Sequence, residues 1–138
     1  MSKDAYVYVP TLQEICNRIM DTDRSIRFVG IANQMSRPIA FTSRAGLELV
    51  LTKDEIDSYM IKIALQMKTA EDVESKLGRV VYTLVFYSKL KRVIIPLKHP
   101  DFSVLVVSFD VSANHEDVIM KKILPLVEDW TGKTASQA

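Results

Sequence analysis

The chain has 138 residues, of which 48% are hydrophobic and 25% charged, and its formal net charge is +1. This composition suffices for one domain with one core, and its charged fraction is ordinary for a globular protein. Acidic and basic residues are interleaved without a basic stripe, which argues against nucleic acid as a partner. The small basic cluster Lys89–Arg92 is explained by solvated charge at a hairpin tip.

Cysteine content and hydropathy argue against two further classes. Cys16 is the single cysteine, so an internal disulfide or a multi-cysteine metal site is excluded. The first residues, Met1–Asp4, are polar and lack the apolar region of a signal peptide. No segment approaches the ~20 apolar residues that a membrane-spanning helix needs. We therefore expect a cytoplasmic protein without membrane insertion.

The N-terminal part predicts a helix followed by two strands. Thr11 to Glu14 fits a capping box, and the apolar face that follows has helical spacing. Residues 26–33 and 37–43 are predicted strands. Gly30 is expected to mark a close approach of the backbone, because glycine otherwise weakens a strand. One face of the first strand is expected to carry Ile26, Phe28, Gly30 and Ala32.

A second, longer helix begins with the capping box Thr52–Glu55. Ile61 and Leu65 lie near the side opposite its main apolar stripe, so they need cover from another surface. Gly78 is a suitable residue to end the helical signal that continues through residues 69–77. The main apolar stripe consists of Ile56, Tyr59, Met60, Ile63, Ala64 and Met67.

The C-terminal half predicts three strands, at residues 79–88, 92–97 and 102–109, followed by a helix. Their Val, Ile, Phe and Tyr content favours strands, and their short connections require antiparallel pairing. The first of them is apolar on both faces, with Val81, Val85 and Tyr87 facing one way, so both faces are expected to be covered. The last helix begins at Asn114 and should kink at Pro125.

This order is accounted for by an α+β fold: a single five-stranded antiparallel sheet with helices on both faces. Over roughly residues 11–130 it resembles the roadblock family, within the profilin-like and longin-like group. The segments Ile26–Asn33 and Leu77–Tyr82 are similar to small stand-alone roadblock-like proteins of archaea. Many family members carry Asp and Gly at the first hairpin, where this chain has Asn33 and Ser36.

We expect one domain over residues 1–138, with an ordered core from about 5 to 131 and a polar tail at 132–138. Roadblock proteins typically homodimerise through paired strands and serve as platforms for small Ras-like GTPases. The resemblance therefore implies a non-enzymatic homodimer with a small GTPase as partner, a heterodimer remaining open. The sequence supports a dimer independently of the resemblance, because the apolar strand at residues 79–88 would invite aggregation if its edge were exposed. The expected interface residues are Ile61, Leu65, Val81, Val85 and Tyr87.

Several residues that suggest chemistry have a simpler interpretation. Gly132–Thr134 resembles the end of a phosphate-binding loop, but Val127 stands where that motif needs a glycine. His115–Asp117 lacks a second histidine at helical spacing and better fits an acidic first helical turn. His99 is expected to be solvated in a loop, and Cys16 to be buried and inert.

Two arginines and two methionines each have two possible roles. Arg37 and Arg44 bracket the second strand and either bind a carboxylate or phosphate or are solvated, and solvation is favoured. Met60 and Met67 either form an adaptable partner surface or pack in the core, which their spacing favours. No catalytic residue, metal or cofactor is predicted, and an enzyme ranks last. The alternative function is a small-molecule sensor of profilin-like architecture, which requires a sizeable apolar cavity between sheet and helices.

Overall fold

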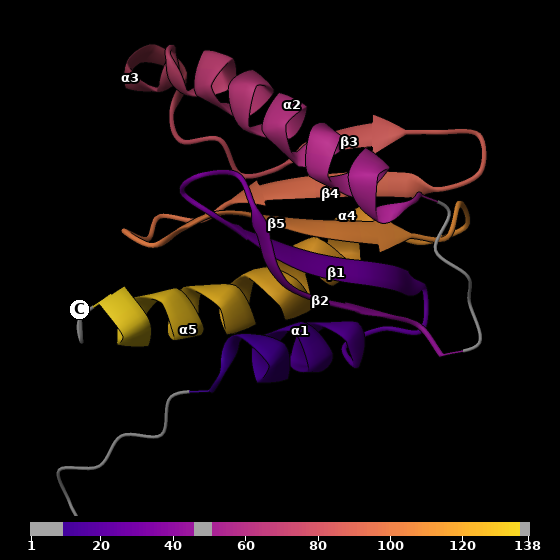
Figure 1. Cartoon of the computed structure of the whole chain (residues 1–138). Helices are drawn as coiled ribbons and strands as arrows, with labels where there is room; N and C mark the ends of the chain where they lie inside the picture. The colour runs from indigo at the N-terminus through magenta and orange to yellow at the C-terminus, as the bar shows by residue number, and fades with distance from the viewer. Residues whose placement is uncertain (1–9, 46–50, 136–138) are drawn as a thin grey trace, which may run out of the picture.

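The computed structural model describes residues 10–45 and 51–135, which form a five-stranded antiparallel sheet with helices on both faces (Figure 1). Across the sheet the strands follow the order β2-β1-β5-β4-β3. The expected fold class is therefore confirmed. The strands are β1 (Ile26–Asn33), β2 (Pro38–Ser43), β3 (Thr83–Phe86), β4 (Lys91–Pro96) and β5 (Phe102–Phe109).

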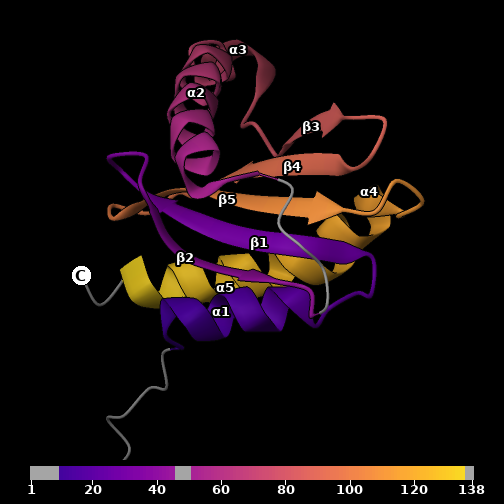
Figure 2. The same cartoon turned by 45° about the vertical axis from the view of Figure 1, so that its right-hand side comes forward.

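Two layers of helices enclose this sheet. The long helix α2 lies on one face, and α1 and α5 lie side by side on the other (Figure 2). Among the described residues, no helix combines the length and the hydropathy needed to cross a bilayer. The helices are α1 (Leu12–Met20), α2 (Lys53–Glu71), α3 (Glu74–Leu77), α4 (His115–Val118), the π-helical turn η2 (Ile119–Ile123) and α5 (Leu124–Ala135).

Local sequence signals place the helix ends as expected. The Thr11 hydroxyl accepts a hydrogen bond from the Glu14 amide at 3.2 Å and begins α1. Thr52 and Glu55 form a reciprocal capping box at the start of α2, with hydrogen bonds of 3.2 and 3.0 Å. Gly78 follows α3 with a φ of 89°, a left-handed conformation that glycine adopts without strain.

Each face of the sheet has its own core. On the α2 side, Met60, Ile63 and Met67 are buried against Ile94 and residues of β5, so the two methionines pack in the core as favoured. The core on the other side is larger, because two helices cover that face. Its buried members include Ile15, Cys16 and Ile19 of α1, Val29 and Ile31 of β1, Val93 and Ile95 of β4, Leu105, Val107 and Phe109 of β5, and Ile123, Val127 and Trp130 toward the C-terminus.

Strand β1 has the expected bounds but not the expected faces. The register between β1 and β5 shifts between Ile26 and Phe28. Ile26 therefore joins Val29 in the core under α1 and α5, and its expected place beside Phe28 is wrong. A Cβ atom at Gly30 would lie 2.9 Å from the Phe28 ring, so the close approach expected there involves a side chain rather than the backbone.

The first hairpin is made without the Asp and Gly that many roadblock proteins carry. The side-chain oxygen of Asn33 accepts hydrogen bonds from the amides of Met35 and Arg37, at 2.9 and 3.0 Å. Ser36 takes the left-handed conformation, with a φ of 63°. Asparagine and serine thus supply the acceptor and the backbone conformation that the turn requires, although serine adopts the latter at a cost.

Two other boundaries differ from expectation. Strand β3 covers only Thr83–Phe86 rather than residues 79–88. Helix α5 continues to Ala135, so residues 132–135 of the expected polar tail are helical. Residues 136–138 lie outside the described residues. The hydroxyl groups of Thr131 and Thr134 find acceptors within this segment, because each donates to a carbonyl group of the preceding turn. Residues 5–9 of the expected core also lie outside the described residues.

The disturbance expected at Pro125 takes the form of a π-helical turn. Residues Ile119–Ile123 widen the helix immediately before the proline. A wider turn accommodates a ring that cannot donate a backbone hydrogen bond. Ile119 and Ile123 remain fully buried, so the π-turn keeps the helix packed against the sheet.

Candidate interaction surfaces

Strand β3 is an unpaired edge of the sheet within the described residues. It pairs with β4 on one side and with no described strand on the other. Large side chains are exposed at this edge: Phe86 is 60% exposed, and Tyr87, which follows the strand, is 39% exposed. Val85 is half-buried. An exposed strand of this composition is a template for pairing with another chain.

The opposite edge, β2, is protected. It begins at Pro38, which lacks an amide donor. The side chain of Gln13 in α1 donates to the Phe41 carbonyl at 3.2 Å, and so occupies a backbone acceptor of this strand. The sheet therefore offers its backbone to a partner at β3 rather than at β2.

A cluster of two tyrosines and an arginine fixes α2 against the end of β3. The hydroxyl groups of Tyr59 and Tyr87 are hydrogen-bonded at 2.8 Å, which, with burial, raises the pKa of Tyr87. The guanidinium of Arg92 lies 4.5 Å from the Tyr59 ring centroid and 5.6 Å from that of Tyr87. The expectation that Arg92 is a solvated charge at a hairpin tip is therefore wrong, because its guanidinium stacks on two tyrosine rings. The spacing of the basic residues gave no sign of this contact.

The long helix carries a second apolar surface on its other flank. Ile61 is 54% exposed and Leu65 is 63% exposed. They border a groove of about 430 Å³ that the β1–β2 hairpin closes through Gln34 and Ser36. In Figure 2 that hairpin and β3 lie on opposite sides of α2. A copy seated on β3 would therefore leave this groove open.

The structure thus separates the five residues expected at an interface. Val85 and Tyr87 lie at the β3 edge, whereas Ile61 and Leu65 lie on the far flank of α2. Val81 does not face the same way as Val85, because it lines a cavity of about 50 Å³ against α5. Strand alternation predicted a shared face, but residues 79–82 are not part of the strand. Sequence reasoning missed Tyr59, Phe86 and Arg92 in this region.

Behind β3, a buried lysine lies against a histidine. The Lys91 ammonium donates to the Ala113 carbonyl at 2.8 Å and lies 3.2 Å from Nδ1 of His115. Burial, followed by the charge of Lys91, lowers the pKa of His115. The segment His115–Asp117 does form the expected first helical turn, capped by Asn114. No group of three metal-capable side chains occurs within the described ranges.

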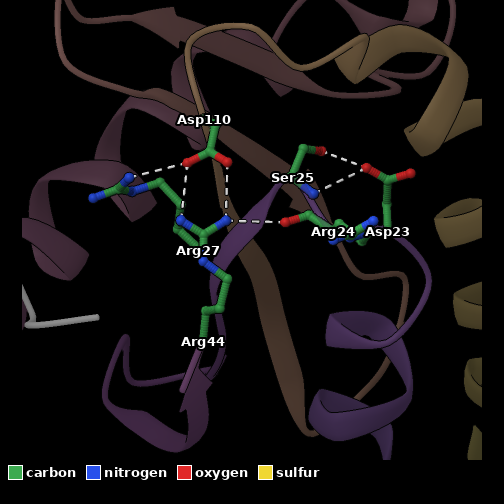
Figure 3. A network of polar contacts seen from close by, with 6 residues as sticks. All are labelled: Asp23, Arg24, Ser25, Arg27, Arg44 and Asp110. Carbon is green, nitrogen blue, oxygen red and sulfur yellow. Dashed lines mark hydrogen bonds and ion pairs between the residues drawn. The ribbon is translucent and has the colours of Figure 1, made fainter. Parts of the chain in front are cut away.

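Asp110 joins the ends of three strands (Figure 3). It follows β5 and accepts from Arg27 of β1 at 3.0 Å and from Arg44, just after β2, at 2.9 and 3.2 Å. Arg44 also donates to the Arg24 carbonyl at 2.9 Å. These contacts, the hydrogen bonds from Arg44 above all, lower the pKa of Asp110. Arg44 therefore binds a carboxylate of its own chain, and the favoured solvated interpretation is wrong; Arg37 is exposed.

The expectation that His99 is solvated is wrong. His99 is 7% exposed, and its ring stacks on Phe102 at 4.5 Å between centroids. Nδ1 accepts from the Asp101 amide at 3.0 Å, and Nε2 contacts the Thr134 hydroxyl at 2.9 Å. Thr134 belongs to the segment that resembles a phosphate-binding loop. Its contact with His99 connects the end of α5 to the β4–β5 loop. Cys16 is buried as expected, which raises its pKa to about 11.

These observations define a class: α+β domains of profilin-like architecture, with one sheet between a long helix and a pair of helices. No family model and no curated protein match the sequence. Solved structures match its fold. The Roadblock/LC7 domain from Streptomyces avermitilis has a TM-score of 0.67 at 10% identity, over 91% of this chain and 98% of that one. The chain has the roadblock fold, and the expected resemblance is confirmed at that level.

Two other solved structures bear on the expectations. MglB in a tetrameric arrangement has a TM-score of 0.63 at 12% identity, over 91% of this chain and 97% of that one. The inducer-binding domain of the Acinetobacter transcription factor PobR, in complex with 3-hydroxybenzoic acid, has a TM-score of 0.52 at 10% identity. That match covers 96% of this chain and all of the other. One fold therefore occurs in an oligomeric assembly and in a small-molecule complex.

Proposed function

We propose that this chain is a non-enzymatic, dimeric interaction module that pairs with a second copy of itself along β3. The observation that carries the proposal is the unpaired apolar edge, at which Phe86 is 60% exposed. Antiparallel pairing of two β3 strands continues the sheet from one copy into the next. It covers the edge side chains and satisfies the outward backbone groups.

The backbone of Phe86 is available for this pairing. The amide of Tyr87 donates to the Leu90 carbonyl at 2.8 Å inside the β3–β4 hairpin. Backbone groups alternate in direction along a strand, so the amide and carbonyl of Phe86 point away from β4. Tyr59 and Arg92 stiffen the same region, and rigid aromatic and arginine side chains suit a pairing surface.

The second surface, around Ile61 and Leu65, is proposed to bind a protein partner. The resemblance to roadblock proteins suggests a small Ras-like GTPase, held by contact rather than by chemistry of this chain. Because this groove lies on the flank of α2 away from β3, one dimer presents two partner sites. The tetrameric arrangement of MglB supports assembly of this fold, although it belongs to that protein.

Two variants separate the surfaces. Phe86→Pro removes the outward amide donor and leaves the hydrogen bonds to β4 in place, whereas Ile61→Asp with Leu65→Asp charges the other flank. Light scattering after size exclusion should give a dimer for the wild type and the double variant, and a monomer for Phe86→Pro. Phe86→Ala, which keeps the donor, is the matched control and should remain dimeric at high concentration.

Partner binding should show the reverse pattern. Small GTPases of the same source organism, loaded with GDP or GTP, should bind the wild type but not the double variant. A wild-type monomer at every concentration would overturn pairing along β3. If the double variant dissociates the dimer and Phe86→Pro does not, the dimer forms through the Ile61 and Leu65 flank of α2, which would contradict pairing along β3.

A small-molecule sensor is the second candidate. The groove of about 430 Å³ favours it, since ligand sites commonly have about 300–1,000 Å³. The PobR domain shows that a related fold is found with an aromatic acid. Against it, Met60, Ile63 and Met67 fill the space directly between α2 and the sheet. A rise in melting temperature with a metabolite, lost in Leu65→Trp, would favour the sensor.

A further inference from the structure

The contact between buried Lys91 and half-buried His115 lies directly behind the edge that we propose for pairing. Lys91 is the first residue of β4 and is 7% exposed. Its ammonium has the Ala113 carbonyl at 2.8 Å and His115 Nδ1 at 3.2 Å as polar partners. Lys91 makes no ion pair within the described residues. An uncompensated buried cation depends strongly on its few acceptors.

Both side chains support β3. Phe86, which is opposite Lys91 in the β3–β4 register, places its ring centroid 5.2 Å from the ammonium. Tyr82, just before β3, meets the His115 ring edge-on, with 6.5 Å between centroids. Strand β3 has four residues and one described neighbour, so Lys91 and His115 support it together with the cluster of Tyr59, Tyr87 and Arg92. The conformation of this edge therefore depends on how Lys91 and His115 are arranged.

The arrangement requires a neutral histidine. An ammonium group has only donors, so Nδ1 of His115 must be the acceptor in the 3.2 Å contact. A proton on Nδ1 removes that acceptor and sets two positive charges against each other at a partly buried contact. His115 is also the first residue of α4, where the helix dipole disfavours a cation.

Other charged groups around the pair do not reverse this effect. Glu116 favours the charged histidine, but less than burial and Lys91 oppose it, so the pKa of His115 stays below its usual 6.5. Asp117 is ion-paired with Lys121 at 2.7 Å. Asp110, in the segment leading to α4, is held by two arginines. Among these groups, Glu116 is therefore the carboxylate that acts on His115, and its effect is smaller than the opposing effects of burial and Lys91.

We propose that His115 and Lys91 form a pH-sensitive support for β3, in which neutral His115 keeps the edge in its pairing conformation and protonated His115 releases it. The consequence for assembly rests on the proposed dimer. A histidine whose pKa is lowered by folding binds its proton more weakly in the native arrangement. The native edge is therefore fully stable above the ordinary pKa of 6.5 and loses stability as the pH falls below it.

The test is the dimer dissociation constant of the full chain, measured by sedimentation at about pH 8 and about pH 5.5. The wild type should bind its copy several-fold more weakly at the lower pH, because protonated His115 can no longer accept a hydrogen bond from Lys91. His115→Gln keeps an acceptor for Lys91 but does not titrate, and should abolish the difference. His99→Gln, which replaces the only other histidine, should keep it.

Hydrogen exchange of the β3 amides is compared between wild type and His115→Gln in the same buffers. It distinguishes a failure of the pH-sensitive support from a failure of the proposed dimer. A dimer with equal affinity at both pH values, or an equal loss in His115→Gln, overturns this inference and leaves the dimer intact. A monomer at about pH 8 overturns the dimer. Exchange then decides whether His115 supports β3: faster exchange of the β3 amides in the wild type than in His115→Gln at the lower pH upholds the support, and equal exchange overturns it.

Discussion

Replacing Asp110 with asparagine should lower the free energy of unfolding by about 2 kcal/mol near neutral pH. Asp110 forms two ion pairs, with Arg27 at 3.0 Å and Arg44 at 2.9 Å, and these side chains are 20–34% exposed. A hydrogen bond to a buried charge contributes ~1.5–3 kcal/mol and an exposed pair ~0.2–1 kcal/mol. Partial exposure places each pair at about 1 kcal/mol. A loss of this size lowers the melting temperature by roughly 4–10 °C for a domain of this length.

The pH dependence gives this prediction its sharpest test. The arginines lower the pKa of Asp110 in the folded chain, so its contribution is present above the unfolded carboxyl pKa of about 4 and is lost as the pH falls through the folded value. Urea unfolding at about pH 7 should separate wild type from Asp110→Asn, and the two should converge in acid. Asp101→Asn is the control, because this exposed carboxylate forms no ion pair with any residue that the structure describes. Equal stability at neutral pH, or a gap that persists in acid, would refute the reasoning.

Two further substitutions test local interpretations by thermal unfolding. Ser36→Gly should raise the free energy of unfolding by about 0.5 kcal/mol, because relief of the left-handed φ of 63° slightly exceeds the entropy that glycine adds to the unfolded chain; a loss of stability would contradict this account of the hairpin. His99→Leu should lower it by about 2 kcal/mol, since Thr134 and the Asp101 amide lose a partner. Thr134→Val breaks one of these contacts from the other side, and additive losses in the double variant would show that the two residues act independently.

The sequence predicts what local patterns determine. The capping residues Thr11 and Thr52 mark helix starts, and the apolar stripe of α2 identifies its buried face. These features depend on neighbours within a few positions, so a single sequence contains them. The exposure of Ile61 and Leu65 follows from the same periodicity.

Features set by distant partners were not predictable. Ile26 changes face because of a register shift against β5, which no pattern within β1 records. His99 is buried by α5, and Arg92 stacks on a tyrosine of α2. Alternation along the expected strand groups Val81 with Val85 and Tyr87, but Val81 precedes β3 and lines a cavity against α5. Charged and polar residues were therefore the least predictable, because their role depends on what the fold brings beside them.

The pairing of β1 with β5 has a consequence for how the chain acquires its structure. Arg27 and Asp110, which lie at one end of this central seam, are 83 positions apart in the sequence. During synthesis the β1–β2 hairpin therefore exists before its permanent neighbour, while α2 and the β3–β4 hairpin are made in between. Such distant closure slows folding. It also makes β1 and β5 mutually dependent, so a truncation that removes either strand should unfold the domain as a whole.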